Sequence, residues 1–140
     1  MTVVADANLL AALVIPTDYS AAAEERFGSW IDDGVEVCSP ALWCFEAASA
    51  IRKHARAHDI DPDEAGRLVR ALTDLPVRTV AADPDLLLAA SEWAARLDQP
   101  VIYDGSYLAL ADRLSADLWT ADRRLARAAT EAGAGNVKGL

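Results

Sequence analysis

Short apolar runs alternate with longer stretches of helical periodicity along the whole chain. Apolar runs bounded by turn residues predict strands, whereas apolar residues spaced three and four apart predict helices. Strands are expected at residues 2–5, 35–38, 77–80 and 118–120, with an edge strand at 136–138. Helices are expected at about 7–14, 18–32, 40–57, 61–74, 83–97, 104–114 and 122–132. This alternation predicts a three-layer α/β/α fold with a parallel sheet of four or five strands and right-handed crossovers.

Proline, glycine and capping residues mark the expected helix ends. Asp61 and Asp83 each precede a proline, the arrangement of an N-cap followed by Pro at the first helical position. Ser39 before Pro40 has the same form, and it predicts a helix that begins at residue 40. Gly34 stands just past a predicted helix, where a residue in the left-handed conformation ends many helices.

The composition is that of a globular protein, and we expect one domain spanning residues 1–140. Hydrophobic residues make up 53% of the chain and charged residues 25%, which lies outside the range of disordered proteins. No apolar run reaches the roughly 18 residues that a membrane span needs. The apolar N-terminal stretch lacks a basic flank and is interrupted by Asp6, unlike a secretory signal peptide. These features predict a cytoplasmic protein that does not associate with membranes.

The cysteine and histidine residues do not form a convincing metal motif. Cys38 and Cys44 lack partners at zinc-binding spacing, so we expect them to be small, buried, apolar side chains. His54 and His58 are four residues apart, which would suit a metal, but their polar neighbours favour a solvated helix face.

The net charge of −9 argues against non-specific binding to long polyanions, because the overall field repels phosphate. It does not exclude an enzyme that acts on nucleic acid. A bound cation such as Mg²⁺ reverses the sign of the field at the place where it binds.

Four carboxylates are candidates for chemistry. Asp6, Asp104 and Asp122 each follow a hydrophobic segment, and Glu46 lies within an otherwise apolar helical stretch. Asp104 and Asp122 have an alternative interpretation as helix N-caps, and Glu46 as a solvated position. Asp6 ends a buried first strand, where we see no structural duty for a carboxylate.

Taken together, the four acids predict a binding site for a hard cation. Asp6 and Asp122 end strands that are neighbours in the usual doubly wound order, and the start of the helix at Asp104 is expected at the same edge. Clustered carboxylates repel one another, so one or more must be protonated or a divalent ion must bind. Mg²⁺ and Mn²⁺ prefer oxygen ligands, and the absence of His and Cys from these positions disfavours zinc.

The order of these residues resembles the PIN domain family, and most closely its VapC-type toxins. The similar motifs are Asp6-x-Asn8 after the first strand, Glu46 in a helix, Asp104-x-x-Tyr107-Leu108-Ala109-Leu110-Ala111, and Thr120-Ala121-Asp122-Arg123-Arg124-Leu125. The resemblance covers essentially the whole chain. It implies an endoribonuclease that depends on Mg²⁺ or Mn²⁺ and is the toxin of a type II toxin–antitoxin pair. It also implies RNA as substrate, a small antitoxin protein as partner, and a homodimer.

The resemblance also implies roles for particular residues. The catalytic residues would be Asp6, Glu46, Asp104 and Asp122. The first, third and fourth would bind the metal, while Glu46 would bind it through water or orient the nucleophile. Thr120 would donate a hydrogen bond that fixes the orientation of the Asp122 region. Asn8 stands where the family often has Ser or Thr, and it can still donate a hydrogen bond to a metal-bound water or to Asp6. Gly105 stands where Ala is frequent.

Basic residues near these acids are candidates for contact with RNA phosphates, which Lys and Arg bind. Lys53 lies two helical turns after Glu46 on the same face, between Arg52 and Arg56. Arg123 follows Asp122 directly, and two further arginines follow it in the sequence: Arg124 and Arg127. We single out Lys53 and Arg123, although surface cations on helices are more often simply solvated.

The aromatic residues are expected mainly in the core, because they are spaced among Ala and Leu at helical or strand periodicity. This expectation covers Trp30, Trp43, Trp93, Trp119, Tyr103 and Tyr107. An alternative for Trp30 and Trp43 is that they line a groove for a partner helix.

Other functional classes fit less well. A receiver-like phosphoacceptor domain needs an adjacent acidic pair early and a Lys after a late strand, but Asp6 stands alone and Lys138 lies too near the end. A haloacid-dehalogenase-like phosphatase needs Asp-x-Asp where this chain has Asn8. A dinucleotide-binding Gly-x-Gly-x-x-Gly motif is absent. A PIN-fold binding module without activity remains an alternative.

Overall fold

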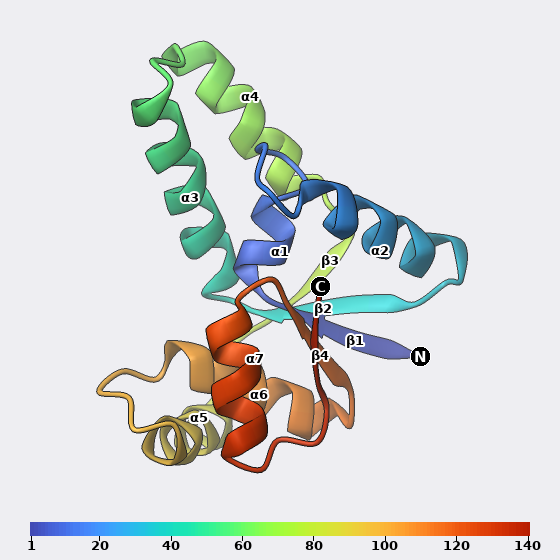
Figure 1. The fold of residues 1–140 in the computed structure, drawn as a ribbon, viewed down its shortest axis with the longest axis vertical. Coiled ribbons are helices and arrows are strands. Elements are labelled where there is room, and N and C mark those ends of the chain that lie inside the picture. The colour runs from blue at the N-terminus through green and yellow to red at the C-terminus, as the bar shows by residue number, and fades with distance from the viewer.

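A five-stranded parallel sheet forms the centre of the molecule, with strand order β3-β2-β1-β4-β5. A computed structural model describes residues 1–140. Helices cover both faces, so the predicted three-layer α/β/α fold is confirmed (Figure 1). The strands are β1 (Thr2–Ala5), β2 (Glu36–Pro40), β3 (Val77–Val80), β4 (Asp117–Thr120) and β5 (Val137–Gly139).

The first four helices cover one face of the sheet and the last three cover the other (Figure 1). Helices α3 and α4 form an antiparallel pair that projects away from the sheet (Figure 1). No helix is both long and apolar enough to cross a membrane. The helices are α1 (Ala7–Ala11), α2 (Ser20–Asp32), α3 (Trp43–Ala57), α4 (Pro62–Thr73), α5 (Pro84–Arg96), α6 (Tyr103–Leu114) and α7 (Arg123–Glu131).

The central strand β1 is paired with β2 on one side and with β4 on the other. Val4 and its β4 partner Leu118 are fully buried, because helices cover the sheet on both faces. As predicted, the strands that precede Asp6 and Asp122 are neighbours. Their carboxyl ends therefore meet at one edge, which is where open α/β sheets bind ligands.

The predicted helix start at Ser39-Pro40 is wrong. Both residues belong to β2, and α3 begins at Trp43 instead. The buried Ser39 hydroxyl donates to the Ala5 carbonyl oxygen on β1 at 2.8 Å, rather than capping a helix. Pro40 lies beyond the last β2 residue that pairs with β1, so its missing N–H costs no hydrogen bond to that strand.

The helix ends predicted at Asp61, Asp83 and Gly34 are confirmed, whereas α1 ends at Ala11 and not near residue 14. Asp61 accepts a hydrogen bond from the Glu64 N–H, and Asp83 accepts one from the Leu86 N–H. Gly34 follows the end of α2 with φ +67°, the left-handed conformation expected there.

Helices α5 and α6 pack closely and are joined by polar contacts as well. The Arg113 guanidinium of α6 donates twice to the Asp83 carboxylate, at 2.7 and 2.8 Å, and the Trp93 indole N–H donates to Asp112 at 2.8 Å. Gly105 explains how closely the backbones approach, because a Cβ added there would lie 2.3 Å from the Ala90 carbonyl oxygen. This packing fixes the first turn of α6, which carries Asp104.

Most of the aromatic residues are buried as predicted. Trp30, Trp43 and Trp93 are each at most 5% exposed, so the first two do not line an open groove. The half-buried Trp119 packs edge-on against Trp30, with ring centroids 5.7 Å apart. The prediction is wrong for Tyr103, which is 55% exposed because it begins α6 at the rim of the fold.

Replacing Gly105 with Ala should destabilise the protein, because the new methyl group has to displace the backbone of α5. We expect a loss of roughly 1–3 kcal/mol in the free energy of unfolding, measured by urea denaturation. The matched control is Gly28→Ala on α2, where a Cβ meets nothing within 4 Å. That variant should be about 0.5–1 kcal/mol more stable than the parent. Equal effects of the two substitutions would contradict the close approach.

Candidate functional site

The four candidate carboxylates line one small cavity of about 60 Å³. They come from separate parts of the chain: the end of β1, the first turn of α3, the first turn of α6, and the end of β4. Ala7, Asn8, Tyr107 and Leu125 complete the lining. The cavity lies at the carboxyl ends of the central strands, which is the edge of the sheet where the sequence predicts a site.

Asp6 is the most buried of the four, with 3% of its surface exposed. Its carboxylate accepts a hydrogen bond from the Leu9 N–H at 2.9 Å and so caps α1. It also accepts one from the Thr120 hydroxyl. The expectation that Asp6 has no structural duty is therefore wrong. Asp6 follows the end of β1 and caps the N-terminus of α1.

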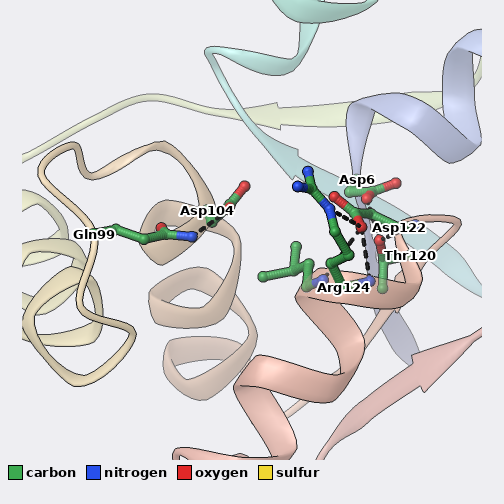
Figure 2. A network of polar contacts seen from close by, with 7 residues as sticks. Asp6, Gln99, Asp104, Thr120, Asp122 and Arg124 are labelled. Atoms are coloured by element: carbon green, nitrogen blue, oxygen red, sulfur yellow. Dashed lines mark hydrogen bonds and ion pairs between the residues drawn. The ribbon is translucent and has the colours of Figure 1, made fainter.

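Thr120 joins the ends of the two central strands. Its fully buried hydroxyl donates to Asp6 and accepts a hydrogen bond from the Asp122 N–H at 2.9 Å. Figure 2 shows these three side chains close together, with Asp104 facing them from the start of α6. A single hydroxyl thus fixes the relative positions of two of the four candidate acids.

The interpretation of the other two aspartates as helix N-caps is right for one of them. Asp122 caps α7 by accepting hydrogen bonds from the Arg124 and Leu125 N–H groups, at 2.9 and 3.3 Å. The Arg124 side chain reaches back to it, with Nε 3.9 Å from Oδ1, but remains 95% exposed. Asp104 is not a cap, because α6 begins one residue earlier and its N-cap is Ile102.

Asp104 is held by Gln99, a residue that the sequence analysis did not identify. The Gln99 side-chain amide donates to Asp104 Oδ2 at 2.8 Å, as Figure 2 shows, while its own Oε1 is buried without a partner. The Gln99 N–H bonds to the Ala94 carbonyl after Asp98 turns with φ +54°, which ends α5 in a Schellman motif. Nothing in this turn sequence indicates that its amide reaches a carboxylate five residues later.

Glu46 is half-buried and is bound by Tyr107, which was expected only as a core residue. The Tyr107 hydroxyl donates to the Glu46 carboxylate. Burial raises the pKa of Glu46, and the negative charge of Asp104 adds to the rise. Burial and the Glu46 charge also raise the pKa of Tyr107, which keeps the phenol protonated as a donor. Tyr107 follows Asp104 by three residues, a helical spacing that places both on one face.

Burial, and to a smaller extent the neighbouring acids, disfavour a negative charge on Asp6. Burial raises the pKa of Asp6 to about 6, and the charges of Asp122 and Glu46 contribute in the same direction. The hydrogen bonds from Thr120 and Leu9 oppose this rise. Negative charge in the cavity is therefore unfavourable unless a proton or a cation compensates it.

The donor atoms suit a hard divalent ion, since all four side chains offer carboxylate oxygens. However, no group of three or more Asp, Glu, His or Cys side chains is arranged so that it could hold a metal ion. Asp104 is turned to Gln99, and Asp6 and Asp122 both serve as caps. Asp104 Oδ1 and Asp122 Oδ2 accept no hydrogen bond, so these two carboxylates can turn toward an ion while their other oxygens keep their present partners.

The candidate phosphate-binding cations differ in their surroundings. Lys53 lines a second cavity of about 660 Å³ that adjoins the acidic one, and it makes no ion pair. Arg123 is exposed and also unpaired. Arg127 pairs with Glu131 at 2.9 Å, and both side chains are largely exposed.

The remaining candidates do not join the site. Cys38 is buried, Cys44 is partly buried, and both are free thiols. The His54 and His58 rings stack on one another with centroids 4.3 Å apart at the far end of α3. Asn8 lines both cavities but is exposed, and its side chain makes no hydrogen bond to Asp6.

Comparison with known proteins agrees with this arrangement. The family model described as PIN domain matches residues 3–131. The chain belongs to the PIN domain family. Ribonuclease VapC3 of Pyrobaculum aerophilum is 30% identical over 127 residues, covering 90% of this chain and 93% of that protein. This likeness makes the chain a PIN domain of the VapC type.

Solved structures show the same PIN fold at low sequence identity. VapC20 of Mycobacterium tuberculosis, described as a sarcin-ricin loop cleaving toxin, has a TM-score of 0.69 at 17% identity, covering 97% of this chain and 98% of that one. VapBC2 of Rickettsia felis, solved with a DNA fragment from its promoter, has a TM-score of 0.70 at 8% identity, covering 99% and 98%. At these identities the similarity concerns the fold alone.

The stability of this PIN domain should fall with rising pH because of Asp6. The pKa of Asp6 rises from 3.8 in the unfolded chain to about 6 in the folded protein, so the folded state binds its proton more tightly. The free energy of unfolding should therefore decrease by roughly 2–3 kcal/mol between pH 4 and 7, measured by urea denaturation in EDTA. Asp6→Asn keeps a hydrogen-bond acceptor but cannot titrate, so its free energy of unfolding should lack this decrease between pH 4 and 7. Parallel pH profiles for the two proteins would contradict the raised pKa.

Proposed function

We propose that this PIN domain is a divalent-metal-dependent endoribonuclease and the toxin of a type II toxin–antitoxin pair. The observation that carries the proposal is the cavity lined by four carboxylates from four separate elements. A structural protein has no use for such a cluster, because repulsion and burial make it costly. Metal-assisted phosphodiester hydrolysis, by contrast, uses a cation at the place where the substrate phosphate binds.

In this proposal Asp6, Asp104 and Asp122 would hold Mg²⁺ or Mn²⁺. When bound, such an ion lowers the pKa of a coordinated water and stabilises the charge on the attacked phosphate. Glu46 would orient the attacking water and accept its proton. Its raised pKa suits that task, because it brings the basicity of the carboxylate closer to neutral pH.

Several neighbours would act by holding these acids in place. Tyr107 donates to Glu46 and leaves the second oxygen of that carboxylate for water. Thr120 and Gln99 donate to Asp6 and Asp104 in the same way. Carboxylate ligands are commonly fixed by such hydrogen bonds, which also lower the cost of ordering them around an ion. Asn8, exposed at the mouth of the cavity, is free to donate to a bound water.

Relatives of the chain support an RNA substrate and an antitoxin partner. The VapC3 relative is named a ribonuclease, and VapC20 is described as cleaving the sarcin-ricin loop. The Rickettsia felis neighbour was solved as a VapBC assembly. We propose that a VapB-like antitoxin covers this site, where an Arg or Lys side chain would neutralise the carboxylates.

A homodimer is part of the same proposal. Leu87 and Leu88 on α5 are 44% and 65% exposed, and Val101 in the α5–α6 loop is 48% exposed. An apolar patch of this kind is typical of a surface that another protein covers. We propose that a second copy of the chain packs against α5.

Purified protein should cleave single-stranded RNA when Mg²⁺ or Mn²⁺ is present, and EDTA should abolish the cleavage. Asp104→Asn should reduce the rate at least 100-fold by removing a proposed metal ligand, followed by gel electrophoresis of a labelled RNA. The matched control is Asp63→Asn, an exposed carboxylate on α4. Cleavage that survives EDTA would end the proposed mechanism. No cleavage under any condition would favour the binding module without activity.

Gln99→Met should weaken Mn²⁺ binding about tenfold, the size expected when a partner of a metal ligand is lost. Methionine keeps the length of the side chain but cannot donate to Asp104. Isothermal titration calorimetry measures the affinity, and the melting temperature in EDTA shows whether the fold is intact. Unchanged affinity in a folded variant would remove Gln99 from the site.

A further inference from the structure

The cavity of about 660 Å³ beside the acidic one has no role in the function proposed so far. The two cavities share Asn8 and Glu46, so a ligand that fills one touches the other. The larger cavity lies between the start of α3 and the start of α6. Its lining is half apolar and half polar, and comprises Asn8, Leu42, Phe45, Glu46, Ser49, Ala50, Lys53 and Tyr103.

Two aromatic rings on this lining face solvent. Phe45 is 80% exposed and Tyr103 is 55% exposed, although the other large aromatic residues of the chain are mostly buried. Exposed apolar area costs roughly 25 cal/mol per Å², so an uncovered Phe gains free energy when a ligand packs on it. Both rings lie at the beginning of a helix that also carries one of the four acids: Phe45 directly precedes Glu46, and Tyr103 directly precedes Asp104.

Polar groups in the same cavity are free to bind a ligand. Lys53 is exposed and has no acidic partner, in a protein whose net charge is −9. It follows Glu46 by seven residues, which places it roughly 10 Å along α3 from that acid. Ser49 lies between them and is also exposed. The cavity thus combines flat apolar rings, a hydroxyl group and a cation.

We propose that this cavity binds an unpaired nucleotide of the RNA next to the phosphate that is cleaved. The base stacks on Phe45, the more exposed of the two rings, and its phosphate approaches Lys53. The proposal rests on the proposed ribonuclease function, and it deepens that function by locating where the base beside the cleaved phosphate is held. Because a base must leave its helical stack to reach the ring, the cavity fits an unpaired nucleotide and not one in a duplex.

The chemistry of the lining favours RNA over a second copy of this chain as the occupant. RNA brings phosphates to an unpaired lysine and bases to two exposed rings, which are the contacts that single-stranded nucleic acids use. The most exposed leucine, Leu88, lies outside this cavity on α5.

RNA binding by ring variants tests the proposal. The parent for all variants carries Asp104→Asn, so that a 12-nucleotide single-stranded RNA labelled with fluorescein stays intact. Fluorescence anisotropy gives the Kd. Phe45→Leu stays apolar but removes the ring, and it should raise the Kd about 5- to 100-fold. Phe45→Trp should restore the affinity of the parent. The control is Ile31→Ala, which truncates an exposed apolar residue on α2 and should leave the Kd unchanged.

An RNA series with one abasic nucleotide at successive positions tests stacking itself. One abasic position should weaken binding by the parent but not by the Phe45→Leu variant, because the base and the ring form one contact. An equivalent duplex should bind the two proteins equally.

The outcomes distinguish an error in the proposed nucleotide cavity from an error in the proposed ribonuclease function. If the parent binds the RNA and Phe45→Leu binds it equally well, the nucleotide cavity is wrong while the ribonuclease function stands. If the parent and all variants fail to bind RNA, the proposed function itself is wrong. If Phe45→Leu only turns a dimer into a monomer, as measured by light scattering, the occupant is a second copy of the chain and the proposal is overturned.

Discussion

Burying the carboxylate of Asp6 at the end of the central strand is the constraint on which this structure depends. An acid that is only 3% exposed is unfavourable without partners. The Leu9 N–H and the Thr120 hydroxyl supply them, so the same carboxylate caps α1 and ties β1 to β4. The Thr120 hydroxyl also accepts from the Asp122 N–H, and the start of α7 is thereby fixed to the same point.

The candidate site consists of two halves with different supports. One half, Asp6 and Asp122, is set by strand pairing and by Thr120. The other half, Glu46 and Asp104, is carried by the first turns of α3 and α6. The position of α6 depends on its close contact with α5 at Gly105 and on the bond from Gln99. The packing of α6 on α5 and the bond from Gln99 therefore decide how Asp104 faces the other acids.

Charge is distributed unevenly around this site. The acidic cavity repels anions unless a cation fills it, whereas the adjoining cavity presents exposed rings and an unpaired lysine. This arrangement reconciles a net charge of −9 with a proposed RNA substrate. Affinity would come from local groups and a bound ion, while the overall field discourages non-specific binding.

The sequence alone determined the layers of the fold and the helix ends that depend on local chemistry. Asp61 and Asp83 cap helices as predicted, because an N-cap bonds to an N–H only three residues away. The alternation of strands and helices likewise predicted that the strands before Asp6 and Asp122 are neighbours. The order of the acids along the chain was enough to indicate the PIN domain family.

Only the tertiary structure decided the features that depend on contacts between distant segments. Ser39-Pro40 carries the same local signal as the true caps, but the Ser39 hydroxyl is taken by the Ala5 carbonyl on the neighbouring strand. The amide of Gln99, the phenol of Tyr107 and the exposure of Phe45 are equally invisible in the sequence. A local sequence pattern fixes which hydrogen bonds a residue can make. The packing of the whole chain decides which of these hydrogen bonds it makes in the folded protein.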